Sequence, residues 1–184
     1  MRNTLAVSFS ILAIAFSFAA CSAPSSASED PQVEAIQAIR PLLGLPDLPL
    51  EYVEETGMAN SPTGNWKVAA YQDSEGRKYF VQPDTNRVVE IDGRNLLPPH
   101  GAAIENALTD EELRARAEKI AAAVISDFSS LQPKLTYDEG QKGNNYFFAW
   151  RDDYSPISFN RPFLQLAFLK NGQLFAYINT LSSE

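Results

Sequence analysis

The feature that most constrains the fold of this chain is the order of its periodic segments, because a helical run followed by four strand-like runs occurs twice. The first helical run spans residues 30–39 and opens with Asp30 and Pro31, a pair typical of the N-cap and first turn of a helix. Apolar residues then recur at three-residue steps, which indicates one buried face. Pro41 disfavours helix at Arg40 and beyond, so the sequence predicts a short helix.

The second helical run is the stronger of the two and predicts a helix over residues 110–129. Thr109 is followed three residues later by Glu112, which is the pattern of a capping box. Acidic residues fill the first turn, where the helix dipole favours negative charge. Apolar residues follow at three- and four-residue steps as far as Phe128, and Pro133 closes the run.

The segments after each helical run are rich in β-branched and aromatic residues. We expect strands at 50–55, 66–72, 78–82 and 87–92 after the first helix and at 134–138, 146–151, 163–170 and 173–180 after the second. Two connections have typical turn sequences, residues 83–86 and the pair Asn171-Gly172, and the second of these is favoured in tight hairpins. Residues 140–143 predict a further turn.

These runs predict an α+β fold in which helices pack on antiparallel sheets. We expect a first helix-plus-sheet repeat at 30–95, a connector at 96–108 and a second repeat at 109–184, together in one compact body. The repeats match in the order of their elements rather than in their residues, and the second repeat has a longer insertion at 152–161. An internal duplication is therefore a hypothesis.

Two hairpin sequences, residues 78–89 and 168–174, resemble the closing hairpin of PepSY-type domains, in which a strand, a short Asp-containing turn and a valine-rich strand follow one another. Asn86 stands where that pattern often has Gly. The resemblance implies tandem cystatin-like α+β domains. Because PepSY-type domains are associated with inhibition or chaperoning of secreted peptidases, it also implies a secreted peptidase as a candidate partner.

The N-terminus has the pattern of a secretory signal peptide over residues 1–20: Arg2, an apolar run at 5–18, and two alanines directly before Cys21. The apolar run is shorter than the roughly 20 residues that a helix needs to cross a bilayer. The cleavage region resembles the bacterial lipobox, although Phe18 replaces the commonest residue there, Leu. The resemblance implies that Cys21 carries the lipid anchor; the alternative is an ordinary signal peptide that leaves a free thiol.

Residues 21–29 are small and polar, so they predict a flexible tether between the anchor and the folded part. We therefore expect an exported protein that is lipid-anchored to a bacterial membrane and faces the periplasm or the cell surface. Removing Arg2 with the signal peptide leaves 14 basic residues against 23 acidic ones, a net charge of about −9. Such a charge repels phosphate backbones, so we expect no nucleic acid partner.

The sequence contains no pattern that dictates a reaction. His100 is the only histidine and lies in a proline-rich connector, so we interpret it as a solvated linker residue. Cys21 is the only cysteine, which leaves no set of ligands typical of zinc and no disulfide. Asp152 and Asp153 could join the glutamates of segment 51–55 around calcium, but no loop of the calcium-binding type accompanies them. We expect no catalytic residue, no metal and no cofactor.

Aromatic residues are dense in and around the expected strand at 146–151, where both faces carry large side chains. One interpretation is a strand covered on both sides. The other is a recognition surface, because aromatic and arginine side chains most often dominate binding energy and a long loop follows this strand. The candidate partner-binding residues are Trp150, Arg151, Tyr154, Phe159 and Arg161.

Together these patterns predict a membrane-tethered, noncatalytic module of the cell envelope that binds a protein or peptide partner. One alternative is a small-ligand carrier or a carboxylate-based hydrolase with a site between helix and sheet, since the spacing of a carboxylate pair depends on the fold. A purely structural envelope component is a third hypothesis.

Overall fold

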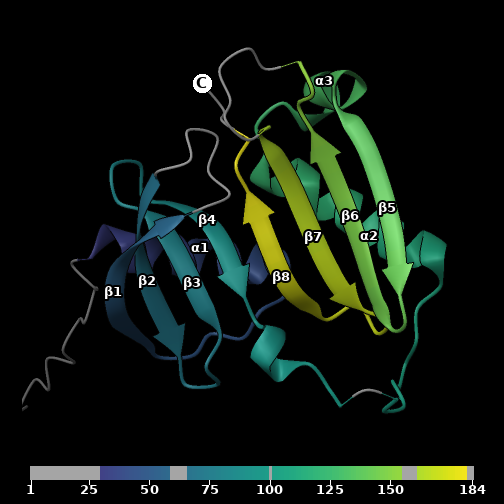
Figure 1. The fold of residues 1–184 in the computed structure, drawn as a ribbon, viewed down its shortest axis with the longest axis horizontal. Coiled ribbons are helices and arrows are strands. Elements are labelled where there is room, and N and C mark those ends of the chain that lie inside the picture. The colour runs from purple at the N-terminus through teal and green to yellow at the C-terminus, as the bar shows by residue number, and fades with distance from the viewer. Residues whose placement is uncertain (1–29, 59–65, 100, 155–160, 182–184) are drawn as a thin grey trace, which may run out of the picture.

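The computed structural model of the protein describes residues 30–58, 66–99, 101–154 and 161–181. The predicted signal peptide at 1–20, the predicted anchor Cys21 with the predicted tether at 21–29, His100 and Phe159 lie outside the described residues. The described part is an α+β structure with one antiparallel sheet of eight strands and three α-helices, all of which lie behind the sheet in Figure 1. The predicted fold class is therefore confirmed at this level.

The sheet consists of two meanders that meet through their last strands. The strands are β1 (Leu50–Met58), β2 (Trp66–Asp73), β3 (Lys78–Gln82), β4 (Arg87–Asp92), β5 (Thr136–Lys142), β6 (Asn145–Arg151), β7 (Phe163–Leu169) and β8 (Leu174–Asn179). Their order across the sheet is β1-β2-β3-β4-β8-β7-β6-β5, which leaves β1 and β5 as the two edges. The meanders join where Glu90 pairs with Ile178 and Ile91 pairs with Tyr177.

Helix α1 (Pro31–Leu43) begins as predicted, with the Asp30 side chain accepting a hydrogen bond from the Gln32 N–H, but it continues beyond Pro41. The prediction that it would end before Arg40 was wrong. Arg40 is buried and donates hydrogen bonds from Nη1 to the Leu48 carbonyl at 2.7 Å and from Nε to the Tyr79 hydroxyl at 3.2 Å. These tertiary contacts hold the last turn in place despite the proline.

Helix α2 (Asp110–Val124) has the predicted capping box, since the Thr109 side chain and the Glu112 side chain each bond the other residue's backbone N–H. It ends at Val124 rather than at residue 129. Ile125 is extended and Asp127 has a positive φ of 57°, and a short helix α3 (Phe128–Leu131) follows. Ile125 and Phe128, on either side of the break, are both buried.

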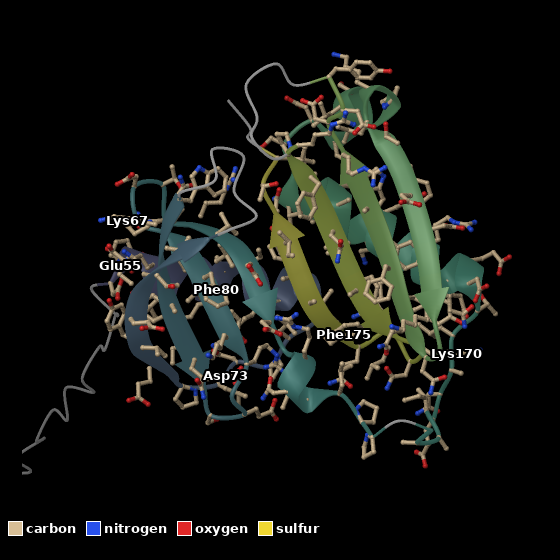
Figure 2. All side chains as sticks on the ribbon, viewed as in Figure 1. Glu55, Lys67, Asp73, Phe80, Lys170 and Phe175 are labelled. Atoms are coloured by element: carbon tan, nitrogen blue, oxygen red, sulfur yellow. The ribbon has the colours of Figure 1, made fainter. Side chains whose placement is uncertain are left out.

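The main core lies between the helices and one face of the sheet. It includes Ile36 and Leu43 of α1, Leu113 and Ile120 of α2, and strand residues such as Tyr79, Ile91, Phe148, Leu166 and Tyr177. Two smaller apolar clusters lie on the other face, which carries no α-helix. Figure 2 labels Phe80 and Phe175, which belong to these two clusters. The 3₁₀ turn Arg94–Leu96 precedes Leu97, which packs against the second cluster.

Candidate functional site

The loop after β6 carries most of the predicted partner residues. Asp152 donates its backbone N–H to the Pro162 carbonyl at 2.9 Å and thereby closes the base of the loop. Tyr154 is 84% exposed, which makes it the most exposed large hydrophobic residue among the described ones. Arg151, at the end of β6, and Arg161, just before β7, are half-buried and exposed, respectively. The structure therefore presents an exposed aromatic ring on the loop, with one arginine at the end of β6 and another just before β7.

Asp153 holds the two arginines together. Its carboxylate accepts hydrogen bonds from Arg161 Nη1 at 2.7 Å and from the Thr136 hydroxyl at 2.5 Å, and Arg151 Nε lies 3.9 Å away. The hydrogen bonds from Thr136 and Arg161 lower the pKa of Asp153 below its usual range. Arg151 Nη1 also lies 3.6 Å from an oxygen of Asp138 on β5. The ionised Asp153 thus orients both guanidinium groups at the loop base.

Trp150 does not belong to this exposed surface, and this corrects its place among the candidate residues. It is only 1% exposed, because alternate residues of β6 point to opposite faces and Trp150 points under the helices with Tyr146 and Phe148. Its ring packs edge-on against Phe128, with the centroids 5.5 Å apart. Trp150 is therefore a core residue.

The opposite face of β6 is open, so β6 is not covered on both sides by the described residues. This agrees with the second interpretation of its aromatic content, in which one face remains accessible. A hollow of about 330 Å³ lies there. Its lining includes Phe147, Ala149 and Phe163 together with the polar side chains of Asp138, Arg151 and Gln165. Arg151 contributes both to this hollow and to the loop base, so the hollow begins next to the base of the exposed loop.

A second hollow of about 200 Å³ lies on the helix side of β5, between that strand and the start of α2. Tyr146 and Phe148 line it, together with Arg114, whose Nε and Nη2 donate to the two oxygens of Glu139 at 2.8 and 2.6 Å. The hydrogen bonds from Arg114 and from the Tyr137 hydroxyl lower the pKa of Glu139 to about 2. This hollow therefore combines aromatic side chains with a fixed ion pair.

Strand β5 is an exposed sheet edge that lies between the two hollows. Six of its seven residues are exposed, and Glu139 and Gly140 line both hollows. A Cβ atom added at Gly140 would meet nothing within 4 Å, so the space beside this residue is open. The prediction of a turn at 140–143 was wrong in part, because residues 140–142 complete β5 and only Gly143 and Asn144 form the turn.

The other sheet edge differs from β5 in its register. The pairing of β1 with β2 has a register shift between Tyr52 and Glu54, whereas β5 pairs with β6 in unbroken register. Such irregularities are a common means of protecting an edge from further pairing. Of the two edges, β5 is the one whose geometry suits an added strand.

No group of three or more His, Cys, Asp or Glu residues that could hold a metal ion occurs within the described residues. The acidic residues that the sequence suggested for calcium are far apart in the sheet order, because Asp152 and Asp153 follow β6 whereas Glu51, Glu54 and Glu55 lie on the edge strand β1. No helix in the described ranges is long and apolar enough to cross a membrane.

Comparisons with protein-family models, with curated proteins and with solved structures gave no match for this chain.

Proposed function

We propose that this protein is a membrane-tethered, noncatalytic lipoprotein of the cell envelope that binds a protein or peptide partner. The observation that carries the proposal is that Arg151 lines the 330 Å³ hollow of the helix-free sheet face and shares Asp153 with Arg161, at the base of the loop that carries the exposed Tyr154. Aromatic and arginine side chains are the usual energetic anchors of interfaces. Asp153 supports this role because it hydrogen-bonds Arg161 and lies within ion-pair distance of Arg151, which reduces the ordering cost of binding.

An extended peptide segment is the form of partner that suits this end of the molecule best. A peptide that adds to the exposed edge of β5 gains main-chain hydrogen bonds, and its side chains alternate between the two faces of the sheet. The two hollows lie on those two faces at Glu139 and Gly140, so consecutive side chains of the peptide enter different hollows.

We also propose that the chain is a tandem of two PepSY- or cystatin-like repeats and that its partner is a secreted peptidase. The arrangement supports the duplication, since each meander follows a helix and the two meanders meet through β4 and β8. Superposition of residues 31–92 on residues 109–180 should bring helix on helix and hairpin on hairpin. A superposition in which the two helices occupy unrelated positions relative to their strands would contradict the duplication.

The lipid anchor is tested by Cys21→Ser. Replacing the thiol removes the only atom to which the diacylglycerol could be attached, so the variant should be unprocessed or recovered as soluble protein. The measurement is partitioning of wild-type and variant protein between membrane and soluble fractions. A Cys21→Ser protein that is cleaved at the same place and still partitions into membranes contradicts the proposal.

Peptide binding is tested with peptides selected against the wild-type protein from a random display library. Tyr154→Ala should weaken their binding roughly 10- to 30-fold, because truncation of an interface anchor commonly costs about 2 kcal/mol. Gly140→Trp should weaken it as well, since residue 140 pairs with Phe147 and the new ring would fill the hollow on the helix-free face. The unfolding free energy of Tyr154→Ala should stay within about 0.5 kcal/mol of wild type, as is usual for an exposed position.

Tyr52→Ala is the matched control, because Tyr52 is an exposed tyrosine at the opposite edge of the sheet. It should leave peptide affinity unchanged. Selected peptides that bind Tyr154→Ala and Gly140→Trp as tightly as they bind wild type would contradict the assignment of this surface.

A further inference from the structure

A groove of about 200 Å³ lies on the helix side of the sheet, where the two meanders meet. Four residues on one side of α1 form an apolar wall: Ala35, Ala38, Ile39 and Leu42. Leu42 is 49% exposed, and Val124 at the end of α2 also lines the groove. This wall is an apolar helix surface that α2 leaves partly uncovered.

The sheet side of the groove is polar at one end, where Arg87 of β4 meets Tyr177 and Asn179 of β8. Arg87 Nη1 donates to the Leu181 carbonyl at 2.9 Å, and its guanidinium carbon lies 5.5 Å from the centre of the Trp66 ring. No acidic side chain pairs with Arg87 in the part of the chain that the structure describes. By contrast, the buried Arg40 forms an ion pair with Asp47, and the buried Arg77 forms one with Asp73.

One buried donor at this end, Arg87 Nε, lacks a hydrogen-bond partner among the described residues. Asn179 Oδ1 also lacks one there, but this oxygen is an acceptor and is not a partner for an anion. Burial lowers the pKa of Arg87 from its ordinary value, because removal from water destabilises the charged guanidinium group. An arginine nevertheless stays charged in proteins. A partly buried cation without a counterion is costly, and a bound anion would reduce that cost.

The Tyr177 hydroxyl adds a neutral hydrogen-bond donor. Burial raises its pKa to about 12, so it keeps its proton at neutral pH. The groove thus combines a cation and a hydroxyl donor at one end with an apolar helix wall along its length. These are the features that recognise an anionic head group on a short hydrocarbon chain.

We propose that this groove binds a small aliphatic monocarboxylate of the fatty-acid type, with its carboxylate at Arg87 and Tyr177 and its hydrocarbon chain along Ala38, Ile39 and Leu42. The volume of about 200 Å³ restricts the ligand to a short or medium chain. The site is separate from the surface at β5 and Tyr154, so it does not depend on the proposed peptide binding. Its ligand is recognised by charge and apolar length together.

The test is calorimetric titration of the mature chain, residues 21–184, carrying Cys21→Ser so that no acyl chain competes for the groove. Octanoate is the probe, and octanol is the uncharged probe of the same chain length. Octanol should bind about 10- to 100-fold more weakly than octanoate, as expected for loss of a charge-assisted hydrogen bond. Arg87→Gln should weaken octanoate binding by a similar factor and leave octanol binding unchanged.

Ala38→Trp tests the apolar wall without changing Arg87. Ala38 is exposed on α1 and lines the groove, so a tryptophan ring at this position would fill it. It should abolish binding of both probes. Lys119→Gln, which removes an exposed cation from α2, is the control and should leave octanoate binding unchanged. Absence of octanoate binding, equal affinity for octanoate and octanol, or full octanoate binding by Ala38→Trp would each overturn the proposal.

Discussion

Trp150→Ala should lower the free energy of unfolding by about 3 to 5 kcal/mol, which is the usual cost of removing a large aromatic side chain from a core. Trp150 is 1% exposed, and its ring contacts Phe128 edge-on and Tyr137 at a centroid distance of 5.4 Å. Truncation leaves a cavity between β6 and α3 that these rings cannot fill. Total stabilities of single domains are about 5 to 15 kcal/mol, so the variant loses a large share of its stability.

Urea unfolding at neutral pH measures this loss of stability, and two further variants serve as comparisons. Trp150→Phe should cost less than Trp150→Ala, because it retains most of the ring and removes the buried indole N–H, which has no partner among the described residues. Tyr154→Ala, only four residues away, should change stability by less than about 0.5 kcal/mol. Equal unfolding midpoints for Trp150→Ala and Tyr154→Ala would contradict the assignment of Trp150 to the core.

Asp73→Ala should have an effect of similar size in the first meander. The Asp73 carboxylate is fully buried at the end of β2, where Figure 2 labels it. It accepts from Arg77 Nη1 at 2.6 Å, from the Tyr79 hydroxyl at 3.0 Å and from the backbone N–H groups of Glu75 and Arg77 at 3.0 Å. Its removal leaves a buried guanidinium without this counterion, and breaking a buried ion pair from one side costs about 3 to 5 kcal/mol.

Glu75→Ala is the control for this second prediction. Glu75 also contacts Arg77, at 3.2 Å, but its side chain is half exposed, and exposed ion pairs contribute at most about 1 kcal/mol. Unfolding in urea should therefore separate the two variants clearly. A loss of stability for Asp73→Ala as small as that for Glu75→Ala would mean that the carboxylate does not hold the β2–β3 turn.

The strands could be predicted from the sequence more accurately than the ends of the helices. β3 and β4 have the predicted bounds, because alternating apolar residues and the turn between them are local signals. The continuation of α1 through Pro41 depends on Arg40, whose partners are Leu48 and Tyr79. These are tertiary contacts that no local pattern contains. The end of α2 lies at an extended Ile125 and a positive φ at Asp127, which the helical spacing of the apolar residues does not indicate.

The candidate surface was predictable only in part. Composition singled out Arg151, Tyr154 and Arg161, and the alternation of β6 could have identified Trp150 as the residue that points to the core. The edge position of β5 could not be predicted, since it depends on how the two meanders join. The same holds for the groove, because Arg87 and Asn179 are 92 positions apart and become neighbours only through pairing of β4 with β8.

Site-specific photo-crosslinking in living cells tests the proposed binding surface most directly. A photoreactive amino acid at position 154 and another at position 141, on the β5 edge, should label the same partner in the membrane fraction. Position 52, exposed on β1 at the opposite edge of the sheet, should give no such product. A partner captured from both 154 and 141 but not from 52 is the result that the proposal predicts. Equal labelling from all three positions, or labelling from 52 alone, would contradict it.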